Sequence, residues 1–307
     1  MKFDKQASTV DDQIKLLLAR GMVISDPEHA QRCLGTIGYY RLSAYWLRFE
    51  SAPTKDVTRS KSFRPGTTFE AVLEDYVFDR KLRVLLMEAI ERIEIHVRSR
   101  WTNRLTLKYG AHAHLNHELF SDGFLHADQL LRLMRSVKQS NETFIKHYND
   151  KYTSPYTPPL WAATELMTMG ELSKWIKATL DNNIKDGVAR DLGFPTKETF
   201  DGTIQTLAYV RNICAHHSRL WNRRMVKRIP KIKRLSALEY EVIKRQEQPT
   251  NYLYNKLVVI LYLLKQQNTD TTFPARLREL VEQRTNTQRE AMGFPQNWRE
   301  SELWEDV

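Results

Sequence analysis

The sequence predicts an all-α protein, and three observations lead to this prediction. Glycine is scarce, with 11 residues in a chain of 307, and long stretches lack residues that break helices. Apolar residues recur at helical spacing in the longest of these stretches. No segment combines the alternation of a half-buried strand with the turn residues of a hairpin. We therefore expect a bundle of helices without a sheet.

The N-terminal third is expected to contain short helices and a polar loop. A first helix is predicted over residues 9–20, and Ser25-Asp26-Pro27-Glu28 is typical of a helix start, with Ser25 as the capping residue. The aromatic residues of segment 29–49 have helical spacing, which favours a core position. Base stacking is the alternative for these aromatics. Residues 51–66 are expected to form a loop.

One long amphipathic helix, or two in succession, is predicted from Phe69 to Leu107. Glu88–Arg92 and Glu94–Arg98 are i,i+4 pairs in it, and most such pairs lie on the surface. Further helices are expected over residues 127–148, 161–180 and 251–267, with another after Gly193-Phe194-Pro195. The apolar stripe of the long helix comprises Leu82, Leu86, Ala89, Ile90, Ile93, Val97 and Trp101.

The chain is expected to form a single unit over residues 1–307. Within it, we expect residues 1–50 to form an N-terminal helical subdomain and residues 66–270 to form the helical core. Residues 271–307 would then be a C-terminal extension. The sequence shows neither a long internal repeat nor a low-complexity tract.

Composition limits the partners and the compartment. Lysine and arginine number 47 against 37 aspartates and glutamates, and the net charge of +10 favours an anionic partner such as nucleic acid. Two cysteines offer no disulfide framework, and the chain lacks both an apolar run of membrane-spanning length and a signal-peptide pattern. These features predict a cytoplasmic protein that spans no membrane.

Segment 110–123 is rich in histidine but has no recognisable metal-binding spacing. His112, His114 and His117 do not follow a known zinc pattern, so a polar loop is favoured over a metal site. No phosphate-binding or dinucleotide-binding glycine motif is present. We therefore expect neither a metal nor another cofactor.

The most informative segment is Arg211-Asn212-Ile213-Cys214-Ala215-His216-His217. Arg211 is expected in the middle of an apolar stripe, where a guanidinium needs an anionic partner such as a carboxylate or a phosphate. Within the protein, Glu91 or Glu94 could supply that carboxylate. The stripe consists of Phe200, Ile204, Leu207, Ala208, Cys214 and Ala215.

An arginine and a histidine at this spacing suggest chemistry on a phosphodiester. Arg211 can stabilise phosphoryl charge, His216 can act as general acid or base, and Asn212 can orient the imidazole. On a regular helix Arg211 and His216 diverge by about 140°. They would meet one phosphate only if the helix ends or bends there, or if two protomers each contribute; His217 is a second candidate. The alternative is a structural pair in a helical core.

Basic residues follow this motif without an intervening carboxylate. Two interpretations are open: a solvated surface, or a track for backbone phosphates that begins beside the motif, which we favour. The candidate RNA-binding residues are His217, Arg219, Arg223, Arg224, Lys227, Arg228 and Lys231, and the run continues to Lys233 and Arg234.

Residues 211–223 resemble the characteristic motif of Abi-like proteins, the AbiD and AbiF types of bacterial abortive-infection factor. The resemblance spans nearly the whole chain. Other matching segments are Ile37-Gly38-Tyr39-Tyr40-Arg41-Leu42-Ser43, Phe78-Asp79-Arg80-Lys81-Leu82-Arg83, Ala89-Ile90-Glu91-Arg92-Ile93-Glu94, Pro159-Leu160-Trp161, Gly170-Glu171-Leu172-Ser173-Lys174-Trp175 and Met292-Gly293-Phe294-Pro295-Gln296-Asn297-Trp298.

The resemblance implies a helical bundle of the HEPN superfamily, commonly a homodimer and often a metal-independent ribonuclease. It implies that Arg211 and His216 are catalytic, with Asn212 as the polar residue after the arginine. It also implies RNA cleavage that leaves a cyclic phosphate and arrests the host during phage infection.

Related toxins have a neutralising partner, and some are silenced on a tyrosine two positions after the histidine. Here Ser218 and Arg219 follow His216 and His217 at that spacing, so a noncoding RNA on the basic segment is the more attractive antitoxin. The alternatives to a nuclease are a noncatalytic RNA-binding protein of the same fold and, less favoured, a DNA-binding regulator.

Overall fold

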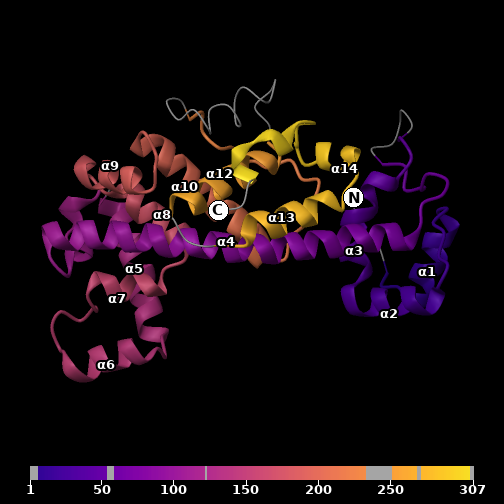
Figure 1. The fold of residues 1–307 in the computed structure, drawn as a ribbon. Helices are drawn as coiled ribbons and strands as arrows, with labels where there is room; N and C mark the ends of the chain where they lie inside the picture. Colours follow the sequence, from indigo (N-terminus) through magenta and orange to yellow (C-terminus); the bar gives the residue numbers. More distant parts are fainter. Residues whose placement is uncertain (1–5, 54–58, 122, 233–250, 268–270, 305–307) are drawn as a thin grey trace. The chain divides into compact units, whose positions relative to one another are not determined.

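The computed structural model describes residues 6–53, 59–121, 123–232, 251–267 and 271–304, and these residues form helices and connecting loops (Figure 1). No strand occurs within those ranges, where β-type pairing is confined to isolated bridges such as Val23 with Thr68. The predicted all-α class is therefore confirmed.

The helices vary in length from one turn to the 41 residues of α4. They are α1 (Val10–Ala19), α2 (Pro27–Ile37), α3 (Tyr39–Trp46), α4 (Phe69–Tyr109), α5 (Gly123–Gln139), α6 (Thr143–Lys151), α7 (Leu160–Ala163), α8 (Met169–Ala178), α9 (Asn182–Asp191), α10 (Lys197–Ala215), α12 (Tyr254–Gln266), α13 (Phe273–Glu282) and α14 (Asn286–Glu290).

Three sequence predictions about helix boundaries need correction. Asp26, not Ser25, caps α2, because its carboxylate accepts the backbone N–H of His29 at 2.8 Å. The helix predicted over 127–148 is interrupted after α5, where the polar residues of segment 140–142 break the periodicity. The helix predicted over 161–180 is also interrupted, because Thr168 and Glu171 form a capping box that starts α8.

The chain divides into two compact units, residues 1–83 and 84–307, and the boundary falls inside α4. In the first unit, Tyr45 and Trp46 are buried, as expected for core aromatics, whereas Tyr40 is 91% exposed. Asp79 is completely buried in the same unit and accepts a hydrogen bond from the Tyr45 hydroxyl at 2.7 Å. Arg83 forms an ion pair with Asp79, which offsets the burial of its charge.

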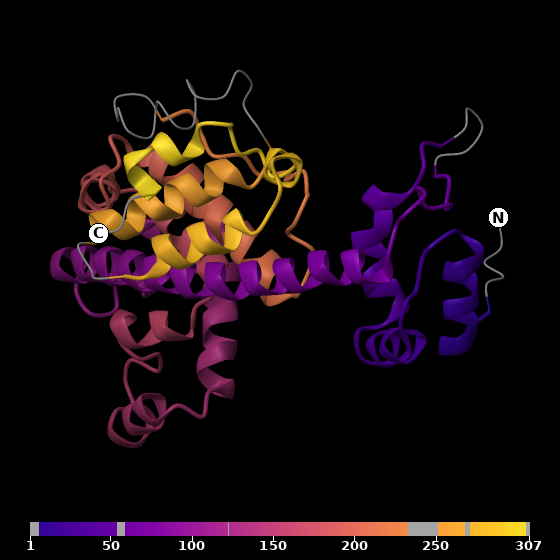
Figure 2. The ribbon, with the colours of Figure 1, turned by 45° about the vertical axis from the view of Figure 1, so that its right-hand side comes forward.

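The second unit is built on the remainder of α4. The predicted apolar stripe of α4 begins at Leu82 in the first unit and continues through the second. Every residue of the stripe is at most 1% exposed, which confirms that prediction. Helix α10 packs against α8 and α9, and the described part of α12 is buried from Tyr254 through Leu264. Helices α5 and α6 lie on the opposite side of α4 from α9 and α12 (Figure 2).

The C-terminal segment closes the second unit with an aromatic cluster. Phe294 contacts the rings of Tyr254, Trp298 and Trp304 at centroid distances of 5.0–5.7 Å. Gly293 has φ +87°, and a Cβ there would lie 2.7 Å from the Cβ of Tyr252, so a larger residue would displace Tyr252, which precedes α12. The segment from Met292 to Trp298 is therefore structural.

Candidate functional site

Helix α10 ends inside the motif, at Ala215. Thr196 caps its N-terminus by accepting the backbone N–H of Thr199 at 3.3 Å. At the other end, the N–H groups of His217 and Ser218 donate to the carbonyls of Cys214 and Ile213 at 3.0 and 2.9 Å. These two bonds form a Schellman motif, which turns the chain sharply after the helix.

His217 occupies the position in this motif that glycine usually takes. Its φ is +55°, in the left-handed region that costs an L residue on the order of 1 kcal/mol. Backbone strain of this kind is common at functional sites. Both His216 and His217 are exposed at this helix end.

We expect His217→Gly to be more stable than His217→Ala by about 0.5–1 kcal/mol. Both variants remove the imidazole, but only glycine relieves the left-handed backbone. Urea unfolding of the two variants measures the difference. Equal unfolding free energies would show that residue 217 stores no strain.

Arg211 lies at the edge of the buried face of α10, not in its centre. The prediction of a central position overlooked Val210 and Ile213, which are buried and shift the apolar face away from Arg211. The Arg211 side chain is 28% exposed, and its Nε lies 3.8 Å from Oε2 of Glu94 on α4. The predicted carboxylate partner is therefore present, and it is Glu94.

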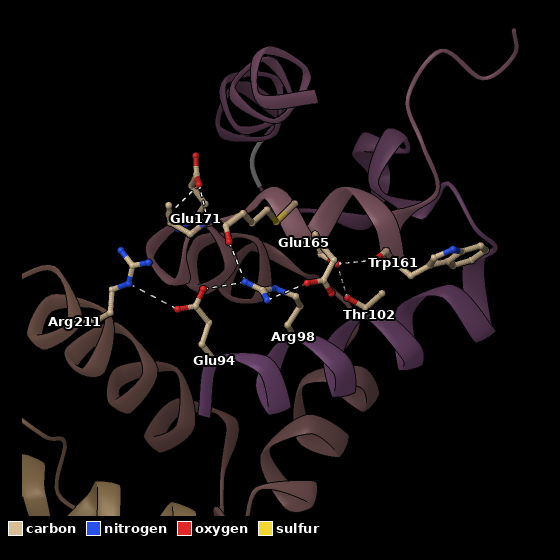
Figure 3. Close-up of polar contacts among 10 residues, drawn as sticks. Glu94, Arg98, Thr102, Trp161, Glu165, Glu171 and Arg211 are labelled. Atoms are coloured by element: carbon tan, nitrogen blue, oxygen red, sulfur yellow. Dashed lines mark hydrogen bonds and ion pairs between the residues drawn. The ribbon is translucent and has the colours of Figure 1, made fainter. Parts of the chain in front are cut away.

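Glu94 also binds a second arginine on its own helix (Figure 3). Its Oε1 accepts from Nη2 of Arg98 at 2.9 Å, and both side chains are about one-tenth exposed. The Glu94–Arg98 pair is thus buried, in contrast to the surface position expected for such pairs. Arg98 also forms an ion pair with Glu165, with Nη1 lying 3.3 Å from Oε2. Its Nη2 donates to the carbonyl of Met167 at 3.0 Å.

These alternating acidic and basic side chains orient the side chain of Arg211. Burial raises the pKa of the Glu94 carboxyl, while the positive charges of Arg98 and Arg211 oppose that rise. Arg211 meets Glu94 only through Nε, and its terminal nitrogens bond to no described residue. Two parallel N–H donors on a positioned guanidinium suit a phosphate.

His216 and Asn212 are exposed on the same end of α10. The backbone N–H of His216 still donates to the carbonyl of Asn212 at 3.0 Å, so His216 begins in helical register. It therefore leaves the helix about 140° away from Arg211. No side-chain hydrogen bond joins Asn212 to His216 among the described contacts, so the structure lacks the predicted orientation of the imidazole by the amide.

The basic segment after the motif is anchored by apolar residues. Trp221, Met225 and Ile229 are buried, and the hydroxyl of Thr206 donates to the carbonyl of Arg228 at 3.0 Å. Arg219 and Arg223 are half-buried, whereas Arg224, Lys227, Arg228 and Lys231 are exposed; Lys233 and Arg234 lie outside the described residues.

Sequence reasoning missed Lys256, which is completely buried on α12. Its Nζ donates to the carbonyl of Tyr252 at 2.8 Å. Burial, with a smaller contribution from the charge of Arg228, lowers the pKa of Lys256 to about 8. The only sequence signal was a lysine inside an apolar helical run.

The histidine-rich segment contains no metal-ligand set within the described residues. His114 is fully buried, and neither ring nitrogen has a hydrogen-bond partner. Burial, with smaller contributions from His112 and His126, lowers the pKa of His114 to about 4. The neutral imidazole therefore acts as a core residue.

This burial predicts a loss of stability in acid. The unfolded chain binds a proton on His114 below about pH 6.5, whereas the folded chain does so only near pH 4. The free energy of unfolding should therefore fall as the pH drops through this window, by up to about 3 kcal/mol. Comparing unfolding of the wild type and His114→Leu at pH 7 and pH 4.5 checks this. The variant should lose less stability over this pH range, and equal losses would contradict the prediction.

None of the described helices combines the length and apolar character that crossing a bilayer requires.

Comparison with known proteins identifies a family over most of this region. The model of the Abi-like protein family matches residues 32–222, which include α4, α10 and the motif from Arg211 to His217. No curated protein and no solved structure matches the chain. The match covers more than half of the 307 residues, and the chain therefore belongs to the Abi-like protein family.

Proposed function

We propose that this protein is a metal-independent endoribonuclease of the HEPN type that acts in abortive infection. Membership of the Abi-like family supports a role in phage defence. The principal structural support is Arg211, whose terminal nitrogens remain available while its Nε faces the buried carboxylate of Glu94. A guanidinium held in this way is suited to a phosphodiester rather than to the protein core.

The reaction we propose uses the nucleophile that RNA carries. One imidazole, of His216 or His217, removes the proton of a 2′-hydroxyl, and the oxygen attacks the adjacent phosphorus. The bond to the 5′-oxygen breaks, that oxygen takes a proton from an acid group, and a 2′,3′-cyclic phosphate remains. Arg211 stabilises the charge on the phosphoryl oxygens.

A homodimer would complete this site. Within one chain, Arg211 and His216 leave α10 about 140° apart, so one phosphate does not meet both from a single regular helix end. In a two-fold dimer, the histidine of one copy can face the arginine of the other. The basic residues from Arg219 to Lys231 then offer contacts to neighbouring phosphates.

Cleavage of RNA by the purified protein in EDTA tests the proposal. We expect cyclic-phosphate ends in the wild type and their loss in Arg211→Ala. The matched control is Arg276→Ala, because Arg276 also pairs with a carboxylate of α4, Glu88, but lies outside the motif. Equal cleavage by the Arg211 variant and the control would refute the assignment.

A noncatalytic RNA-binding protein is the second candidate. The exposed basic residues Arg224, Lys227, Arg228 and Lys231 favour it, since they support binding whether or not cleavage follows. Binding of cellular RNAs in EDTA without cleavage of any RNA tested would support this candidate. For either function, we propose that the neutralising partner is a noncoding RNA bound to the basic segment after the motif.

A further inference from the structure

Exposed aromatic side chains gather in one stretch of the second unit. Phe144 on α6, Tyr152 and Tyr156 after it, and Trp161 on α7 are 38%, 47%, 68% and 54% exposed. Large aromatic side chains usually bury most of their surface, and concentrated exposure of this kind marks an interaction site. We call residues 144–161 the aromatic segment.

The packing of neighbouring residues enforces this exposure. Ile145 is 1% exposed, so Phe144 beside it on α6 faces a different direction. Leu160 and Ala163 are completely buried, and the N–H of Leu160 donates to the carbonyl of Ala111 at 2.8 Å. Trp161 consequently faces solvent, because its neighbours hold the inward positions of α7.

Cations occur on the same part of the chain, on α5 and α6. Arg135, Lys138 and Lys146 are exposed and form no ion pair within the described chain. Nζ of Lys151 lies 5.3 Å from the ring centroid of Tyr152. Aromatic rings interspersed with cations are the features that single-stranded nucleic acid uses, through base stacking and phosphate contacts.

Charge argues against a second copy of the chain as the occupant of this surface. Residues 123–161 hold five lysines and arginines against three carboxylates. A two-fold contact places the same surface of each copy against the other, so two segments that each carry a net positive charge would face one another. A polyanion removes this repulsion.

Trp161 is connected to the candidate site through a series of contacts (Figure 3). Its carbonyl accepts from the hydroxyl of Thr164 at 3.5 Å, and Glu165, the next residue, pairs with Arg98. Arg98 pairs with Glu94, which faces Arg211. Trp161 and Arg211 therefore lie at opposite ends of one series of contacts, which Trp161 joins through its backbone carbonyl.

We propose that the aromatic segment stacks on the bases of single-stranded RNA whose scissile phosphate lies on Arg211. This inference rests on the proposed nuclease function and narrows its substrate to RNA with unpaired bases. Duplex RNA keeps its bases stacked inside the helix and offers no ring to Trp161 or Tyr156. The segment would thereby discriminate between unpaired and paired RNA.

Binding measured in a His216→Ala background tests the proposal without cleavage. Fluorescence anisotropy of a labelled 12-nucleotide single strand and of the same strand in a duplex gives both affinities. Trp161→Ala and Tyr156→Ala should each weaken single-strand binding about tenfold and leave duplex binding unchanged. Trp161→Phe keeps a ring and should recover most of the loss. Tyr40→Ala is the matched control, because Tyr40 is a 91% exposed aromatic in the first unit.

The outcomes separate this proposal from the proposed function. Unchanged single-strand affinity in Trp161→Ala, or equal loss for the duplex, overturns the stacking proposal even if the wild type cleaves RNA. Stacking that is confirmed in a protein that never cleaves supports the base-stacking role of the aromatic segment, but it rejects the nuclease and with it a scissile phosphate on Arg211. A change from dimer to monomer in Trp161→Ala, measured by sedimentation velocity, would instead identify the segment as a contact between copies.

Discussion

Arg211→Ala and His216→Ala are each expected to lower the rate of RNA cleavage by about 10²–10⁴-fold. The first removes the charge that stabilises the phosphoryl oxygens, and the second removes a proton-transfer group. Single-turnover cleavage of a defined RNA in EDTA measures both effects. The controls are Arg276→Ala and His117→Ala, since His117 is an exposed histidine outside the motif.

Mixing the two inactive variants tests whether the site is shared between subunits. If Arg211 of one copy acts with His216 of the other, a mixed dimer contains one intact site and one doubly altered site. Co-refolding equal amounts should then restore about a quarter of the wild-type rate, from random pairing of copies. Cleavage that stays at background after verified mixing would contradict the shared site.

Glu94→Ala is expected to destabilise the protein by roughly 3 kcal/mol and to reduce cleavage in parallel. Arg98 is 10% exposed, and loss of Glu94 leaves it with Glu165, which is 54% exposed and screened by solvent. Arg211 loses its facing carboxylate at the same time. Urea unfolding and single-turnover cleavage measure the two effects.

The matched control for this prediction is Glu88→Ala. Glu88 also pairs with an arginine from another helix, Arg276, but both side chains are more than 40% exposed, so the loss should stay below about 1 kcal/mol. A second variant separates stability from positioning. Glu94→Leu combined with Arg98→Leu removes both buried charges and should regain much of the stability. Its cleavage should stay low, because Arg211 still lacks Glu94.

The sequence predicted the parts of the fold that depend on local periodicity. The prediction of an apolar stripe from Leu82 to Trp101 was correct, because a residue of the buried face recurs every three to four positions along a long helix. The ends of α5 and the start of α8 were missed. There the competing signals were single polar residues, such as Thr168, whose capping role depends on the geometry of the chain.

The candidate site was only partly predictable for the same reason. A guanidinium in an apolar helix predicted a carboxylate partner, and Glu94 was one of two candidates. Nothing in the spacing showed that the Glu94–Arg98 pair is buried, or that Lys256 is an ammonium inside the core. Burial of a charge depends on which helices cover it, and that is a property of packing.

The sequence by itself therefore determined the helical class, the motif from Arg211 to His217 and the net positive charge, because each is a matter of residue identity and spacing. Only the tertiary structure decided that Glu94 links Arg211 to Arg98, that α10 stops in a Schellman turn on His217, and that Trp161 faces solvent. These features join residues far apart in the chain or set the path of the backbone. Their free energy comes from contacts that exist only after folding.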